Sequence, residues 1–451
     1  MPEKVAIVTL GCEKNQVDSD IMSELIERRG YVLTDHAGEA NVVVVNTCGF
    51  IDTAKESSVD TILRMARLKK HGQLKSLIVT GCLVQRYQEM LLDEMPEIDG
   101  LVGTGDFVRI PEVIEAALNK ERPVFVGPPV YRYEDLRRPR RKSPVAFVKI
   151  AEGCDNGCTF CAIPLMRGGL RSRPISTIVE EVRQFVASGV KEICLIAQDL
   201  SSYGKDMDGT LKLPELLRAL ETIEGLVWVR LHYLYPGALT DELLEVMATS
   251  DKVVPYLDLP LQHSHPWILK RMRRPNHAAD VRELIAKIRR IMPDVAIRTS
   301  LILGFPGETE EHVEHLLDFL SEVELDRVGV FTYSDEEGTP AVRLSDHVPQ
   351  AVKEERAERI REHQRPITAR RNARLVGKTV PVIIERWDPK AGVHIGRTPY
   401  DAPEVDGEVA VGGYIGKLGE IVPVKITHAY DYDFVGQYSP AASLSSLKEA
   451  R

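Results

Sequence analysis

The chain has 451 residues, of which 43% are hydrophobic and 28% are charged. That length predicts two to four domains with packed cores, and no apolar run is long enough to span a bilayer. The amino-terminal residues lack the pattern of a signal peptide, so we expect a cytoplasmic protein with no membrane partner. The net charge of -9 argues against a chain-wide electrostatic grip on nucleic acid.

Residues 1–131 form the first predicted domain, in which apolar strands alternate with amphipathic helices. Segments 5–10, 42–46 and 76–80 are almost continuously apolar, as is typical of a parallel sheet covered on both faces. Strand–helix–strand order of this kind predicts a doubly wound α/β domain. The charged segment 132–144 is the predicted linker, whose arginines could touch a phosphate, although a solvated connector explains them more simply.

The strand–helix rhythm resumes over residues 145–374 with a longer period. Six candidate strands follow one another there, at 146–151, 192–197, 227–234, 253–261, 295–304 and 326–334. Six β/α units predict a partial barrel, because a complete (β/α)8 barrel needs eight. The charged helical stretch after the last strand contains Pro366, where we expect a kink or a break.

Short strands spaced by glycine, proline and aspartate predict a small all-β domain at 375–438, followed by a loose polar tail at 439–451. The predicted fold class is therefore α/β. An N-terminal doubly wound α/β domain precedes a central partial (β/α)6 barrel, and a small C-terminal β-barrel or sandwich ends the chain.

Seven cysteines are too few for a disulfide scaffold, so we expect metal ligands, catalytic thiols or core residues. The strongest motif is EGCDNGCTFC, which places Cys154, Cys158 and Cys161 in one short loop. Soft thiolates select iron–sulfur clusters or zinc. A zinc site would need a fourth ligand from a distant part of the chain, whereas a three-cysteine 4Fe–4S cluster leaves one iron open for chemistry.

Three more cysteines, Cys12, Cys48 and Cys82, each follow a predicted strand of the N-terminal domain. The carboxyl ends of parallel strands share one edge of a sheet, so these thiols should converge there. Any one of them alone is explained as a small core residue. Three at the same topological place predict a second three-cysteine cluster, while Cys194, inside a strand, is predicted to be core.

The motif CxxxCxxC after the first strand of a β/α barrel resembles that of the radical S-adenosylmethionine (radical SAM) enzymes. In that family the open iron binds the amino and carboxylate groups of SAM, and an electron from the cluster cleaves SAM to methionine and a 5′-deoxyadenosyl radical. The resemblance implies that Cys154, Cys158 and Cys161 are the catalytic, SAM-cleaving set.

The wider pattern looks like the methylthiotransferases. It comprises the three N-terminal cysteines, the stretches GCEKNQVDSDIM and GCDNGCTFCAIPLMRGGLRSRP, and the terminal β-domain. The resemblance implies a TRAM domain at 375–438 and two 4Fe–4S clusters, of which the one at Cys12, Cys48 and Cys82 handles sulfur. It also implies two SAM molecules per turnover, one for the methyl group and one for the radical.

Polar residues of the barrel strands are candidates for contacts with SAM by their location alone. They are Gln198, Asp199, Gln262 and Arg298. Arg298 could pair with the SAM carboxylate or form an ordinary ion pair. A His-x-His pair, His263 and His265, could bind a metal, but no third ligand is in sight.

The family branches by substrate: one branch modifies an adenosine of transfer RNA, and the RimO branch modifies an aspartate of the twelfth small-subunit ribosomal protein. Residues 376–438 carry six Lys/Arg against nine Asp/Glu. A net acidic domain suits a basic ribosomal protein better than RNA, which needs a basic face. FTYSDEEGTPA and APEVDGEV also resemble the RimO branch. We expect Asp335, Glu336 and Glu337 near the barrel mouth, with a solvated acidic turn as the alternative.

The resemblance therefore predicts a radical SAM methylthiotransferase that modifies the β-carbon of that aspartate. Its predicted partners are the ribosomal protein, docked by the terminal domain, an electron donor and a sulfur source, with nucleic acid not expected as substrate. Two alternatives remain open: the same chemistry on transfer RNA, and a non-catalytic iron–sulfur protein that stores clusters or carries electrons.

Overall fold

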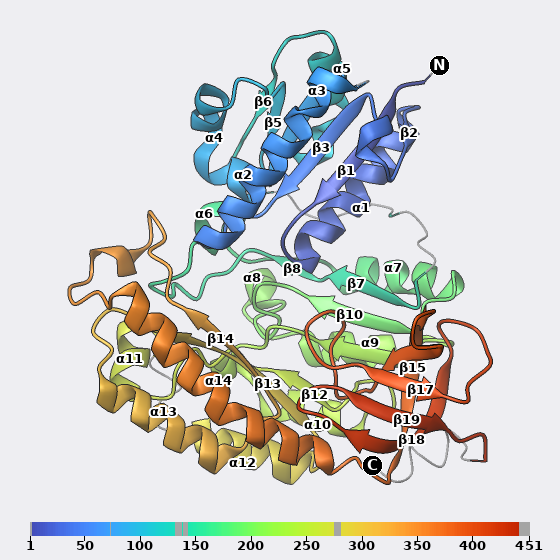
Figure 1. Ribbon diagram of the computed structural model, residues 1–451, viewed down its shortest axis with the longest axis vertical. Coiled ribbons are helices and arrows are strands. Elements are labelled where there is room, and N and C mark those ends of the chain that lie inside the picture. The colour runs from blue at the N-terminus through green and yellow to red at the C-terminus, as the bar shows by residue number, and fades with distance from the viewer. Residues whose placement is uncertain (1, 73, 131–137, 139–142, 275–280, 442–451) are drawn as a thin grey trace.

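The computed structural model describes every residue except 1, 73, 131–137, 139–142, 275–280 and 442–451. Most of the predicted linker and tail therefore lie outside the described residues. An N-terminal α/β unit lies over a central barrel, and a small β-barrel packs beside it at the other end (Figure 1). In the described part of the chain, no helix has the length and apolar character needed to cross a membrane.

A six-stranded parallel sheet forms the N-terminal unit, in the order β2-β1-β3-β4-β5-β6. The strands are β1 (Lys4–Thr9), β2 (Val32–Leu33), β3 (Val42–Thr47), β4 (Ser76–Gly81), β5 (Gly100–Val102) and β6 (Val124–Phe125). All six residues of β3 are buried, which explains its four valines. The chain changes direction across the sheet between β1 and β3, the switch point where doubly wound folds bind ligands.

Helices cover both faces of this sheet, which confirms the doubly wound prediction. One core contains residues of α1 and α5, and the other contains residues of α2 and α4. The helices are α1 (Glu13–Arg28), α2 (Asp52–Ala66), α3 (Leu68–His71), α4 (Cys82–Glu94) and α5 (Ile110–Leu118).

Six parallel strands form the central unit in chain order, as predicted. They pair as two three-stranded sheets, β7-β10-β11 and β12-β13-β14, which a parallel bridge from Val229 to Val253 joins. The strands are β7 (Val145–Lys149), β10 (Glu192–Ile196), β11 (Trp228–Leu231), β12 (Tyr256–Asp258), β13 (Ala296–Leu303) and β14 (Arg327–Thr332). The covering helices include α7 (Ile175–Ala187), α9 (Leu213–Glu221), α10 (Asp241–Thr249), α12 (Val281–Ile291) and α13 (Glu310–Val323).

Helix α14 (Gln350–Ala373) runs unbroken through Pro366, so the predicted break is wrong. Ile360 and Ile367 on either side of the proline are buried in the barrel core. Gln364 also donates from Nε2 to the carbonyl oxygen of Leu325 at 2.8 Å. These tertiary contacts outweigh the one helical hydrogen bond that proline removes.

A closed five-stranded barrel, β15-β16-β17-β19-β18, forms the C-terminal unit. Its strands are β15 (Thr379–Asp388), β16 (Val393–Arg397), β17 (Val409–Gly412), β18 (Ile421–Ala429) and β19 (Phe434–Tyr438). It packs against the amino ends of the central strands: Ile383 and Ala402 share an apolar core with Trp228 and Ala296, the first residues of β11 and β13.

Glu192, the first residue of β10, is fully buried at this junction. Arg397 of the terminal barrel donates to its Oε2 at 2.5 Å, and Arg230 of β11 donates to its Oε1 at 2.7 Å. Burial alone would raise the pKa of Glu192, but Arg397 and Arg230 outweigh burial and lower it to about 2. The carboxylate therefore stays ionised while buried.

We expect the free energy of unfolding to fall as the pH drops from 4.5, the ordinary pKa of this group, toward 2. The folded protein keeps Glu192 ionised in this window, whereas the unfolded chain takes up a proton, so acid favours unfolding. Urea unfolding of the wild type and Glu192→Gln at neutral pH and at about pH 3.5 measures this. Their difference in unfolding free energy should change between the two pH values; a constant difference would contradict the assignment.

The N-terminal unit lies over the central barrel (Figure 1), and Tyr233 and Glu336, which follow the carboxyl ends of β11 and β14, contact it. Glu336, which follows β14, is 2% exposed and accepts from Arg86 at 2.6 Å and from Lys55 at 3.1 Å. Asp335 pairs with His347 at 2.9 Å. Glu336 is thus not a solvated acid but an ionic link between the two units.

Candidate active site

The three N-terminal cysteines lie at the carboxyl edge of the sheet, as predicted. Cys12 directly precedes α1, Cys48 follows β3, and Cys82 is the first residue of α4. Cys12 is exposed, Cys48 is half-buried and Cys82 is buried. Cys12 and Cys48 both act electrostatically on the pKa of Cys82, so the fold brings the three thiols near one another.

Two glycines allow the loops that carry these cysteines to touch. A Cβ on Gly11 would lie 2.9 Å from Cys48 Cβ and 3.2 Å from Cys48 Sγ, and Gly11 has a φ of +90°. A Cβ on Gly49 would lie 2.8 Å from the backbone of Leu83. Any larger residue at either position would push the loops apart.

Asn15, in the first turn of α1, holds two of these loops. Its Nδ2 donates to the carbonyl oxygen of Leu10 at 2.8 Å and to that of Thr47 at 3.0 Å. Thr47 directly precedes Cys48, and Leu10 lies two residues before Cys12. Asn15 is 1% exposed, and these buried bonds fix the geometry of the cysteine edge.

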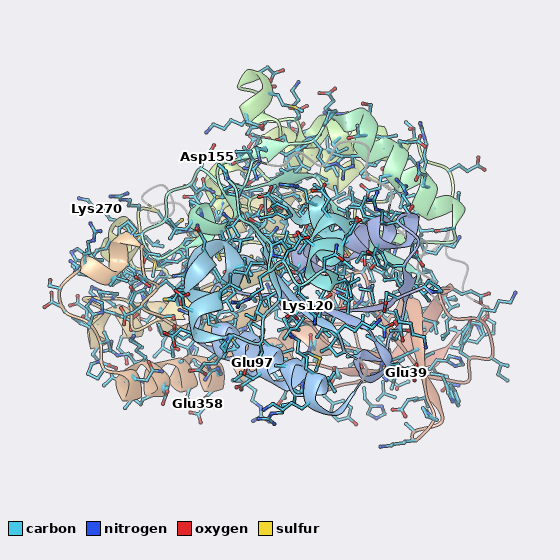
Figure 2. All side chains as sticks on the ribbon, turned by 90° about the horizontal axis from the view of Figure 1, so that it is seen from above. Glu39, Glu97, Lys120, Asp155, Lys270 and Glu358 are labelled. Carbon is cyan, nitrogen blue, oxygen red and sulfur yellow. The ribbon has the colours of Figure 1, made fainter. Side chains whose placement is uncertain are left out.

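The second cysteine set lies in the loop between β8 (Ala151–Glu152) and α6 (Ile163–Arg167). Cys154, Cys158 and Cys161 are all half-buried. The Cys154 N–H donates to the carbonyl oxygen of Gly168 at 3.1 Å, which folds the loop back on itself. Figure 2, seen from above, shows Asp155 of this loop at the edge of the N-terminal unit.

Asp199 supports this loop. It is 2% exposed and accepts from Asn156 Nδ2 at 2.7 Å and from Ser202 Oγ at 2.6 Å. Asn156 lies between Cys154 and Cys158, so Asp199 holds the segment that presents both thiols.

Arg274 also contacts the loop, and the sequence offered no sign of it. Its Nη1 donates to Cys158 Sγ at 3.4 Å and its Nη2 donates to the carbonyl oxygen of Pro260 at 2.6 Å. The guanidinium lies 4.5 Å from the ring centroid of Tyr235. The guanidinium therefore gives this cysteine a charged hydrogen-bond donor.

Burial raises the pKa of Cys82 and Cys154 to about 11 and that of Cys161 to about 12. Thiols of this kind are inert nucleophiles at neutral pH. A bound metal deprotonates a coordinating thiol outright, and ligation then releases protons. Each set supplies three sulfur donors, which is the chemistry that an iron–sulfur cluster requires.

Each set supplies three sulfur ligands, one fewer than a structural zinc site takes. Among the described residues, no group of three or more His, Cys, Asp or Glu side chains is placed to hold one metal ion. A tetrahedral zinc would draw its sulfur ligands to within roughly 4 Å of one another.

Cys82 of the N-terminal set contacts the segment that follows the second cysteine set. Cys82 packs in one apolar cluster with Ala162, the neighbour of Cys161, and with Met166 of α6. Arg167, at the end of α6, donates from Nε to Cys82 Sγ at 3.3 Å. The end of the barrel loop is therefore in direct contact with the N-terminal set.

Besides Asp199, three candidate SAM contacts lie in different surroundings. Gln198 donates from Nε2 to Glu152 beside the cysteine loop, and its Oε1 is buried with no hydrogen-bond partner among the described residues. Gln262 has a φ of +73° and donates its N–H to the carbonyl oxygen of Ser300 at 2.8 Å. Arg298 bonds to Asp258 at 3.0 Å and lies 3.6 Å from an oxygen of Asp406, in the C-terminal unit. Contact with SAM remains a prediction for all three.

The His-x-His pair is not arranged as a metal site. His263 Nδ1 accepts from the His265 N–H at 2.9 Å, and His265 Nδ1 accepts from the Trp267 N–H at 3.2 Å. A neutral imidazole whose Nδ1 accepts carries its proton on Nε2 and has no lone pair left for a metal.

Comparison with known families matches each unit separately. Residues 4–103 match the uncharacterized protein family UPF0004, residues 148–320 match the radical SAM superfamily, and residues 376–438 match the TRAM domain. The fold is similar to that of the radical SAM methyltransferase TsrM from Kitasatospora setae, with a TM-score of 0.54, 14% identity, and coverage of 76% of this chain and 77% of that one. Together with the cysteine loop on its barrel, these matches define a radical SAM enzyme.

Curated relatives match nearly the whole chain. The ribosomal protein uS12 methylthiotransferase RimO of Geobacter sulfurreducens is 45% identical, over 96% of this chain and 98% of its own length. The RimO of Desulforamulus reducens is 46% identical, over 96% and 99%. The chain belongs to the RimO family of radical SAM methylthiotransferases.

Proposed function

We propose that this enzyme transfers a methylthio group to the β-carbon of an aspartate in ribosomal protein uS12. The names of its relatives support this substrate. The observation that carries the chemistry is the contact of Cys82 with Ala162 and Met166. Sulfur bound at the N-terminal cysteines would therefore lie near the loop where a radical SAM enzyme activates its substrate.

We also propose that the enzyme carries two 4Fe–4S clusters, one at Cys12, Cys48 and Cys82 and one at Cys154, Cys158 and Cys161. When bound, the second cluster supplies the open iron for SAM and the electron that cleaves it. The chain positions the ligands through Asn15 and Asp199. The buried Oε1 of Gln198 is available to a donor on SAM, and Gln262 and Arg298 are further proposed contacts.

The domain limits that we propose are 1–131, 145–374 and 375–438, with the linker and tail outside them. An electron donor and a sulfur source complete the proposed partners. The terminal domain packs on the amino ends of the barrel strands. A substrate docked there would have to extend along the molecule to the cysteine loop at the opposite end.

Anaerobic incubation of the reconstituted enzyme with SAM, a strong reductant and a sulfide source tests this function. With uS12 as substrate, mass spectrometry should find one methylthio group on an aspartate, and transfer RNA offered in parallel should stay unmodified. Methylthiolation of the RNA alone would overturn the choice of substrate. Absence of 5′-deoxyadenosine from both reactions would instead favour a non-catalytic iron–sulfur protein.

A further inference from the structure

Arg167 is a barrel residue whose buried guanidinium contacts Cys82 of the N-terminal cysteine set. It lies at the end of α6, in the segment that follows Cys161, and is 2% exposed. Its Nε donates to Cys82 Sγ at 3.3 Å, across the boundary between the barrel and the N-terminal unit. It is therefore a barrel residue bonded to a cysteine of the other site.

The rest of the guanidinium is held in place by the N-terminal unit. Nη1 donates to Asp18 Oδ2 at 2.7 Å, and Nη2 donates to Asn15 Oδ1 at 2.6 Å. Asn15 in turn bonds the loops before Cys12 and Cys48. A planar fork bound on three sides cannot turn away from the sulfur without breaking the others.

Carboxylates of the described residues already pair with Arg167, so the contact with sulfur is not its only ionic or polar contact. Asp18 bonds Lys149 at 2.8 Å as well as Arg167, and Glu152 lies 2.7 Å from Lys149 and 3.2 Å from Arg167. Among the residues that the structure describes, two buried cations thus contact two buried carboxylates. The hydrogen bond from Arg167 Nε to Cys82 Sγ is made in addition to these ion pairs.

We propose that Arg167 is a positioning residue that orients Cys82 and sets the reduction potential of the N-terminal cluster. This inference rests on the proposed function, because it takes Cys82 as a cluster ligand. Reduction adds negative charge to a cluster, and hydrogen bonds to its sulfurs together with nearby positive charge stabilise that charge. Arg167 therefore holds the potential higher than the cysteines alone would.

The test uses the full chain with Cys154, Cys158 and Cys161 replaced by alanine, so that only the N-terminal cluster remains. Adding Arg167→Gln removes the charge and the donation to sulfur. A redox titration followed by electron paramagnetic resonance should give a more negative midpoint potential. Arg167→Lys keeps the charge but cannot reach Cys82, Asn15 and Asp18 together, so its shift should be smaller and in the same direction.

Thr104→Val is the matched control. Thr104 Oγ1 donates to the carbonyl oxygen of Met166 at 2.5 Å, so this variant removes another buried bond to α6 without touching Cys82. Its potential should equal that of the background. If Arg167 had only a structural role, Arg167→Gln and Thr104→Val would change the midpoint potential to a similar extent.

The possible results distinguish the role of Arg167 from the existence of the N-terminal cluster. A background protein that binds no iron would overturn the proposed N-terminal cluster. A cluster that forms with an unchanged potential in Arg167→Gln would overturn the role of Arg167 alone. If Arg167→Gln does not fold, Arg167→Lys decides: a negative shift beyond that of Thr104→Val supports the role, and no shift overturns it.

Discussion

Replacement of Cys12, Cys48 and Cys82 together with alanine should abolish methylthio transfer to uS12 while reductive SAM cleavage survives. These thiols belong to the sheet edge of the N-terminal unit, whereas the loop of Cys154 is held from within the barrel by Asp199 through Asn156. Loss of one set therefore leaves the ligands of the other in place. The iron content should fall by about half, since each proposed cluster holds four irons.

Iron analysis, 5′-deoxyadenosine production and modification of uS12 are the three measurements. The reciprocal variant, with Cys154, Cys158 and Cys161 replaced, should lose half the iron and both activities. Cys194→Ala is the matched control, because Cys194 is fully buried inside β10, outside both sets. It should keep its iron and both activities. Full iron retention in the first variant would show that Cys12, Cys48 and Cys82 bind no cluster.

Replacement of Arg397 with methionine should lower the free energy of unfolding by about 3 kcal/mol, because it leaves Glu192 buried with half of its charge partners removed. Arg397 is 1% exposed and, besides Glu192, bonds Glu385 at 2.8 Å and the carbonyl oxygen of Asp401 at 2.8 Å. Urea unfolding at neutral pH measures the loss.

Arg386→Met is the control from the same small barrel. Arg386 pairs with Glu408 on the surface, where both side chains are about half exposed. An exposed pair contributes less than about 1 kcal/mol. If the two variants unfold at the same urea concentration, the buried junction with Glu192 contributes no more than a surface contact.

Much of the fold could be predicted because each unit has a strong local pattern. The buried valines of β3, the six strand–helix repeats and the glycine-spaced terminal strands all correspond to elements of the structure. The convergence of Cys12, Cys48 and Cys82 followed from topology alone, since parallel strands end at one edge of a sheet. No contact between particular side chains was needed for that prediction.

The residues that support the site could not be predicted in the same way. Arg274 reaches Cys158 and Arg167 reaches Cys82 from far along the chain, and a lone arginine carries no periodic signal. Pro366 does not break the helix, because residues on both sides of it pack into the core of the central barrel. Likewise, an acidic turn looks the same in sequence whether it is solvated or, like Glu336, paired with Arg86 between two units.

The contact between the terminal barrel and the central barrel limits how this enzyme can be re-engineered. Arg397, Asp401 and Asp406 reach across to Glu192, Arg327 and Arg298 of the central barrel. A chimera that takes its TRAM domain from a relative lacking these three residues would leave Glu192, Arg327 and Arg298 without these charged partners. An exchange of this domain between relatives therefore has to include both partners of each of these ion pairs. The alternative is to transfer only loops of the domain that lie outside the contact.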